Sequence, residues 1–161
     1  MPIYKAPTRD TRFVINEVLN LDTYGDLPGF ENAGADMVDT VVEECGRFAA
    51  EVLAPLNQSG DLEGCTRNAD GSVTTPKGFK EAFVQYRESG WGTLASPVEY
   101  GGQGMPHVLG FALEEFLASA NQAFAMYPGL TQGAIAAIVR HGSAEQKAAY
   151  LPKMIEGRWT G

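Results

Sequence analysis

The side chains in this sequence that are best suited to acid–base or metal chemistry are the adjacent carboxylates Glu114 and Glu115. A di-iron site in a helical bundle requires Glu-x-x-His pairs on facing helices, and the residue three positions after Glu115 is Ala118. Adjacent residues on a helix also point about 100° apart, so the two carboxylates do not face one site. We interpret the pair as part of a solvated helix face and predict no metal site.

The histidines and cysteines do not form a catalytic group either. His107 follows a proline near an expected helix start, and His141 stands at an expected helix end, where the helix dipole stabilises a cation. No serine or cysteine occupies a nucleophile elbow or another triad signature. Cys45 and Cys65 lack CxxC or other metal-ligand spacing, so we expect two reduced thiols. The sequence therefore predicts no catalytic residue within the chain.

The Gly-rich segment YGGQG, residues 100–104, is the remaining candidate for ligand binding. It matches neither of the glycine-rich nucleotide-binding patterns, GxxxxGK[ST] and GxGxxG. Backbone N–H groups gathered before a helix hold phosphates in some proteins, but glycines serve tight turns far more often. Taken alone, the segment favours a structural turn.

The elements that position these residues are predicted from hydrophobic spacing. No sustained strand alternation and no internal repeat occurs. The fold class expected is an all-α helical bundle with one long Gly-rich loop in the middle. The predicted helices cover residues 10–21 (capped by Asp10), 36–54, 75–90, 107–119, 121–142 and 143–154.

Several boundaries of these helices follow from prolines and capping residues. Pro55 is expected to end the second helix, because the residue before a proline is disfavoured in the helical region. The pair Thr75–Pro76 suits the N-cap and first turn of the third helix. Residues 127–129, Tyr-Pro-Gly, are expected to interrupt the fifth helix. Ser143 and Gln146 form a capping box for the last one.

Composition excludes several classes of protein. The chain has 161 residues, of which 44% are hydrophobic and 20% charged, which is typical of one globular domain. Its formal net charge of −8 argues against nucleic-acid binding, which relies on Lys and Arg. No stretch approaches the roughly 20 apolar residues of a membrane span. The start of the chain has no apolar signal core, so a cytoplasmic location is expected.

Three stretches together resemble the N-terminal helical domain of the acyl-CoA dehydrogenase family. GWGTLASPVEYGGQGMP, residues 90–106, is similar to the family's loop with a Pro-x-Glu-x-Gly-Gly core. GSAEQKAAYLPKMIEGRWTG, residues 142–161, resembles its Gly-x-x-x-Gln-Lys-x-x-Tyr-Leu-Pro segment. The opening MPIYKAPTRDTRFVINEVL resembles the N-terminal extension of a subgroup with longer chains, which includes 3-methylmercaptopropionyl-CoA dehydrogenases.

The resemblance implies a domain organisation and a reaction. Residues 1–33 are expected to be an N-terminal extension, 34–157 the helical domain, and 158–161 the start of a β-domain that lies beyond this chain. The complete enzyme would use FAD to oxidise an acyl-CoA to the trans-2-enoyl-CoA, with a glutamate base in a further C-terminal domain. This chain alone is expected to be inactive and to bind no FAD tightly, and its cofactor-binding residues are not assigned.

The resemblance also implies a role for this domain in substrate binding. It would supply a wall of the acyl pocket from the helix after the Glu114–Glu115 pair, through Phe124, Tyr127, Leu130 and Thr131. Core packing of these same four residues is the alternative. Large groups at Phe124 and Tyr127 would favour short or medium acyl chains.

The partners that the resemblance implies are the acyl-CoA substrate, an electron-transfer flavoprotein and further copies of the same subunit. Two other hypotheses stay open from sequence. One is a family-derived protein that has lost oxidation or runs another flavin reaction. The other is a free-standing, non-catalytic helical binding domain.

Overall fold

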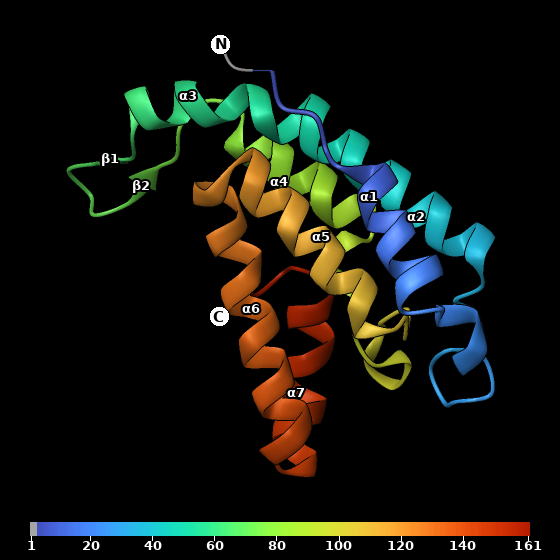
Figure 1. The fold of residues 1–161 in the computed structure, drawn as a ribbon. Coiled ribbons are helices and arrows are strands. Elements are labelled where there is room, and N and C mark those ends of the chain that lie inside the picture. The colour runs from blue at the N-terminus through green and yellow to red at the C-terminus, as the bar shows by residue number, and fades with distance from the viewer. Residues whose placement is uncertain (1–2) are drawn as a thin grey trace.

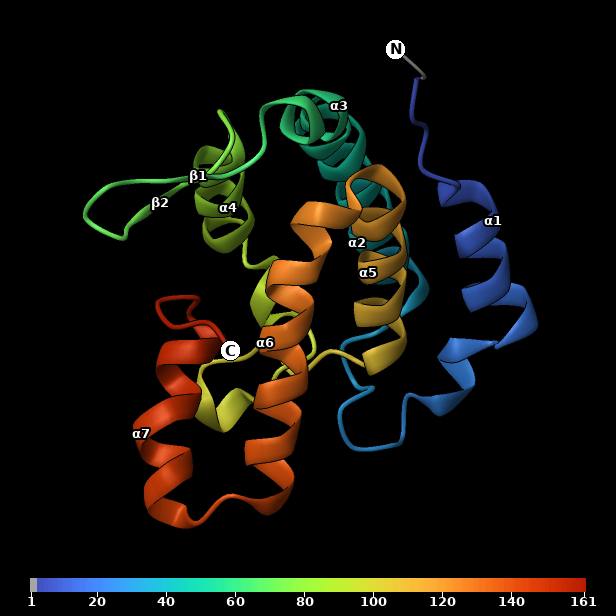
Figure 2. The same cartoon turned by 90° about the vertical axis from the view of Figure 1, so that its left-hand side faces the viewer.

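The computed structural model describes residues 3–161, so the first two residues of the expected N-terminal extension lie outside the described part. Helices dominate, and they gather into a long helical layer and an antiparallel pair, α6 and α7, that extends away from it (Figures 1 and 2). The all-α class predicted from sequence is confirmed. Among residues 3–161, no helix is long and apolar enough to cross a membrane.

The longest helical stretch runs from Ala35 to Glu63. It consists of α2 (Ala35–Phe48), a π-helical turn (Ala49–Leu53) and α3 (Ala54–Glu63). The prediction that Pro55 ends this helix is wrong. Pro55 stands in the first turn of α3, directly after the π-helical turn, where its missing N–H removes no regular i→i+4 bond from a helix interior.

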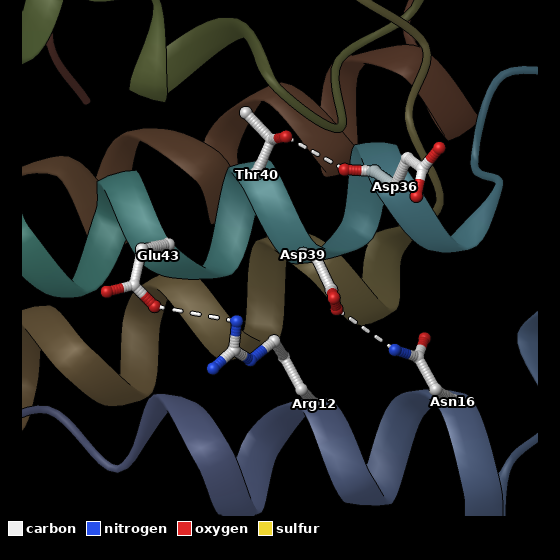
Figure 3. A network of polar contacts seen from close by, with 6 residues as sticks. All are labelled: Arg12, Asn16, Asp36, Asp39, Thr40 and Glu43. Carbon is white, nitrogen blue, oxygen red and sulfur yellow. Dashed lines mark hydrogen bonds and ion pairs between the residues drawn. The ribbon is translucent and has the colours of Figure 1, made fainter.

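The N-terminal helix α1 (Thr8–Phe13) continues into a π-helical turn, Val14–Val18, and lies along α2. Asn16 Nδ2 donates to Asp39 Oδ1 at 3.0 Å, and Arg12 pairs with Glu43 at 3.7 Å, so polar contacts join the two helices (Figure 3). The expected start at Asp10 is wrong by about half a turn. Ile15 is the buried residue here, whereas Phe13, Val14 and Val18 are exposed.

A two-residue antiparallel hairpin follows α3, with β1 (Thr66–Arg67) paired to β2 (Val73–Thr74). The turn between the strands contains Asp70 and Gly71, with Gly71 in the left-handed region at φ +84°. Helix α4 (Phe79–Glu88) begins after Gly78, so the predicted cap at Thr75–Pro76 is wrong. The Lys77 N–H donates to the Glu63 carboxylate at 3.1–3.2 Å, which ties this segment to the end of α3 before the helix begins.

The last three helices are α5 (His107–Ala120), α6 (Gln122–His141) and α7 (Ala144–Ile155). The α5 prediction and the Ser143–Gln146 capping box are confirmed. The predicted break at residues 127–129 is wrong, because α6 runs through a buried Pro128. One cluster of apolar side chains lies among α2, α4 and α5, and a second, which includes Ile135 and Leu151, holds α7 against α6.

Candidate functional site

A groove of about 640 Å³ between α5 and α6 is the main concave feature of the described residues that lies beside the predicted site. The two helices form an antiparallel pair (Figure 2), and residues of the turn after α4 also line the groove. The residues that line it come from four segments. They are Tyr86 on α4; Trp91, Gly92, Leu94 and Ala95 in the turn; His107, Gly110, Phe111, Leu113, Glu114, Leu117 and Ala118 on α5; and Gln122, Ala125, Met126, Pro128, Gly129, Leu130, Gln132, Gly133 and Ala136 on α6.

Small residues keep this groove open along α6. Gly129 and Gly133 stand one helical turn apart, and a Cβ atom added to either would meet nothing within 4 Å. Neither glycine is therefore required by close packing. A glycine in a helix interior costs roughly 0.5–1 kcal/mol relative to alanine. The helix thus carries two destabilising residues whose visible effect is to leave space in the groove.

The walls of the groove are largely apolar and partly open to solvent. Phe111, Met126 and Leu130 are 68%, 54% and 62% exposed. Three large apolar side chains exposed in one concave surface are typical of a place that another group covers. The polar side chains His107, Glu114 and Gln122 are exposed at its border.

The inner side of the groove reaches the buried ring of Tyr86. Burial, followed by the nearby Glu114 and Cys45, raises the pKa of the Tyr86 phenol far above its ordinary value. The ring therefore stays neutral at physiological pH and presents no charge to the groove. A mostly apolar groove, with Glu114 exposed at its border, suits a hydrocarbon chain better than an ionic ligand.

The four residues predicted to line an acyl pocket do not share one face of α6. Leu130 lines the groove. Phe124 is buried in the core, where its ring meets Tyr86 edge to face at 6.0 Å. Tyr127 packs edge to face on Phe83 at 5.0 Å, outside the groove. Neither Phe124 nor Tyr127 lines the groove, so large side chains at these two positions do not shorten it.

Thr131 lies on the opposite side of α6 from the groove and anchors the end of the chain. Its side chain is buried, and Thr131 Oγ1 accepts a hydrogen bond from the Gly161 N–H at 3.2 Å. Nearby, Thr160 Oγ1 donates to the Tyr127 hydroxyl at 3.4 Å. Residues 158–161 form no strand in the structure, and Trp159 lies under Lys153, whose Nζ is 4.2 Å from the ring centroid.

Sequence reasoning missed most of the groove-lining residues of α6. Their signal is a run of small side chains at helical spacing, Ala125, Gly129 and Gly133, each four residues after the last. Because α6 is continuous, each residue turns about 100° from the one before it. That rotation separates Leu130 from Thr131 and places them on different sides of the helix.

The Gly-rich loop is a self-contained turn and not a phosphate cradle. The N–H groups of Gly102, Gln103, Gly104 and Met105 all donate to carbonyls of residues 93–97 at 2.9–3.0 Å. A Cβ on Gly102 would lie 2.0 Å from the Ser96 carbonyl oxygen, so the backbone approaches too closely for a larger residue. With its amides already paired, this loop has no donors left for an anion.

The other candidate residues form no reactive group. Glu114 and Glu115 are both exposed, and residues 3–161 contain no cluster of His, Cys, Asp and Glu able to hold a metal ion. Cys45 is buried, and burial raises the pKa of its thiol to about 12. Cys65 is exposed and follows the end of α3. Among the features that contain a residue predicted for the acyl pocket, the groove is therefore the one with space for a ligand.

Comparison with known proteins identifies the family of this chain. A family model described as "Acyl-CoA dehydrogenase, N-terminal domain" matches residues 36–158. The chain is 42% identical over 158 residues to the 3-methylmercaptopropionyl-CoA dehydrogenase of Ruegeria pomeroyi, covering 98% of this chain and 27% of that protein. It is 31% identical over 120 residues to mitochondrial isovaleryl-CoA dehydrogenase of Pongo abelii, covering 71% of this chain and 25% of that protein.

The chain thus spans about a quarter of the length of these relatives. The matched region contains α2 to α7, including both walls of the groove. The resemblance seen in the three sequence stretches is confirmed. This chain belongs to the acyl-CoA dehydrogenase family, and residues 36–158 correspond to that family's N-terminal domain.

Proposed function

We propose that this chain is the N-terminal domain of an FAD-dependent acyl-CoA dehydrogenase, and that the α5–α6 groove forms one wall of its acyl pocket. The complete enzyme would oxidise an acyl-CoA to the trans-2-enoyl-CoA. The observation that carries the proposal is a largely apolar groove of about 640 Å³, kept open by unpacked glycines, in a chain of this family. The names of the two relatives support acyl-CoA as the substrate class.

The role of this domain in that reaction is binding and shielding. Phe111, Met126 and Leu130 would cover the hydrocarbon part of the substrate and exclude water from it. Burial of each substrate methylene contributes roughly 0.8 kcal/mol to binding, so a groove of this kind discriminates between acyl chains of different length and branching. Glu114 and His107, the carboxylate and the imidazole on its lining, are both exposed, and we assign the base to another part of the enzyme.

FAD, which would accept the hydride when bound, does not fit the residues described here. The Gly-rich loop has its amides paired internally, and the groove offers an apolar surface without a set of converging donors. We therefore propose that the flavin is held mainly by residues outside these 161, that residues 158–161 lead toward that part, and that this chain alone neither retains FAD nor turns over substrate. An electron-transfer flavoprotein as oxidant, a homo-oligomeric enzyme and a cytoplasmic location belong to the same proposal.

A filled groove tests the proposal in the complete enzyme. Gly133→Leu places a side chain into open space in the groove, so the protein is expected to fold. One methylene of misfit in an apolar pocket changes kcat/KM by roughly 10–200-fold, so we expect a loss of at least about tenfold with acyl chains that reach this position. Acyl-CoA-dependent reduction of a dye acceptor measures it.

Ala149→Leu on α7 is the matched control, because Ala149 is an exposed helical residue outside the groove. This variant should keep the parent activity. Equal activity of Gly133→Leu and Ala149→Leu would reject the groove as the acyl site. A complete protein that oxidises no acyl-CoA would instead favour the alternative, a non-catalytic helical binding domain derived from the family.

A further inference from the structure

A second, much smaller cavity adjoins the groove at its floor, which is the part of the groove lined by Tyr86, Gly92, Pro128 and Gln132. Its volume is about 20 Å³, enough for about one water molecule. Apolar groups from α4 and α7, among them Phe83, Met154 and Ile155, line its far side. The groove and this cavity share Tyr86, Gly92, Pro128 and Gln132, and these four residues form the partition between them.

Three members of the partition are fixed by the fold itself. Tyr86 is 5% exposed and packs against Phe83 and Phe124. Pro128 is buried within α6. Gly92 has no side chain, and a Cβ there would lie 3.2 Å from the Tyr86 ring. Their positions follow from core packing and from the helix.

Gln132 is the member that closes the partition with a movable side chain. It is half-buried, and its Nε2 donates to the Gly92 carbonyl at 2.7 Å, which links α6 to the turn after α4. The bond shows that the Gln132 side chain reaches from α6 to the turn, so its atoms cross the floor. The turn that receives it is held on its other side, where Gln103 Nε2 donates to the Gly90 carbonyl at 2.9 Å.

We propose that the Gln132 side chain sets the depth of the acyl groove and is therefore a specificity determinant for acyl-chain length. This inference rests on the proposed function. The amide crosses the floor and blocks entry to the small cavity beyond. Without its bulk, the groove and that cavity become one continuous apolar space that admits a longer or bulkier chain end.

The test compares two variants of the complete enzyme across a series of saturated acyl-CoA substrates. Gln132→Ala removes the partition. Relative to the parent's best substrate, the kcat/KM of the next longer chain should rise about tenfold, the effect of one methylene in an apolar pocket. Gln132→Met keeps an unbranched side chain of similar length without the hydrogen bond, and should leave the profile within about twofold of the parent.

Each outcome decides the proposal. An active Gln132→Ala enzyme with the parent's profile would overturn it. An equal shift in Gln132→Ala and Gln132→Met would also overturn it, since the hydrogen bond and not the side-chain bulk would then be the cause. Gln132→Ser, as short as alanine but able to hold a hydroxyl near the turn, repeats the test if the alanine variant does not fold. A parent enzyme without any acyl-CoA oxidation would instead reject the proposed function itself.

Discussion

Asn121 connects the two walls of the groove, and its replacement by alanine should strongly destabilise the domain. The residue separates α5 from α6 and is 1% exposed. Its Oδ1 accepts the Phe124 N–H at 3.0 Å and so caps the start of α6. Its Nδ2 donates to the Leu53 carbonyl at 3.2 Å, in the π-helical turn between α2 and α3. One side chain thus joins three helices.

The magnitude follows from these two hydrogen bonds. Loss of an N-cap costs roughly 0.5–2 kcal/mol. Leu53 is the N-cap of α3, so its carbonyl keeps a backbone donor, and loss of the bond from Asn121 costs about 0.5–1.5 kcal/mol. The two losses share one residue and are not fully additive, so we expect Asn121→Ala to lower the free energy of unfolding by about 2–3 kcal/mol.

Urea unfolding of the 161-residue chain, followed by circular dichroism at helical wavelengths, measures this change. With a urea m-value of about 2 kcal/mol/M, the midpoint should fall by roughly 1–1.5 M. Asn121→Ser should fall between parent and alanine, because serine retains the cap but does not reach Leu53. Gln122→Ala, one residue along and exposed, is the control and should stay within about 0.5 kcal/mol. An Asn121→Ala midpoint equal to that of the control would refute the reasoning.

Two further predictions concern the thiols and the Gly-rich loop. In the native chain one thiol, Cys65, should react with a disulfide reagent at pH 8, and both should react in urea, because Cys45 is 1% exposed and burial raises its pKa to about 12. As pH rises, the unfolded chain loses the Cys45 thiol proton before the folded chain does, so stability should fall between about pH 9 and 12. The fall should be at most about 1.4 kcal/mol per pH unit, which urea midpoints at several pH values would detect. Two native thiols that react with the reagent at equal rates would contradict the burial of Cys45. Gly102→Ala should cost at least about 3 kcal/mol, because its Cβ would overlap the Ser96 carbonyl, whereas Gly101→Ala, at φ +96° in open space, should cost about 1–2 kcal/mol. Thermal unfolding ranks the two, and the reverse order would contradict the loop geometry.

The helical class and several helix ends could be predicted because they depend on local chemistry. Ser143 and Gln146 satisfy each other's neighbouring backbone groups within one turn, so the capping box forms wherever the helix does. Gly90 and Gly157 follow helix ends in the left-handed region, at φ +75° in both cases. These signals involve residues close together in sequence, and no distant contact competes with them.

Prolines gave the wrong boundaries because tertiary packing outweighs their local effect. Pro55 and Pro128 each remove one backbone donor, a cost confined to a single turn. Around Pro128, the helix is held by Phe124 and Thr131 on its buried side, where the residues pack against α4 and the end of the chain. Around Pro55, a π-helical turn absorbs the irregularity, and Asn121, 68 residues from Leu53, supplies a donor to that turn. No local pattern could reveal that donor.

The groove shows why the candidate site was only partly predictable. The family resemblance placed the pocket at Phe124, Tyr127, Leu130 and Thr131, yet the α6 face that lines the groove carries mainly small side chains. A stronger signal was the cost of Gly129 and Gly133 inside a helix, since neither glycine adopts a left-handed conformation or permits a close contact. Gly129→Ala and Gly133→Ala fit the backbone and would gain helix stability, so neither backbone conformation nor close packing explains the two glycines. Under the proposed function, the two glycines leave space in the groove for the acyl chain, and a ligand that is absent from the sequence pattern would then be the reason for them.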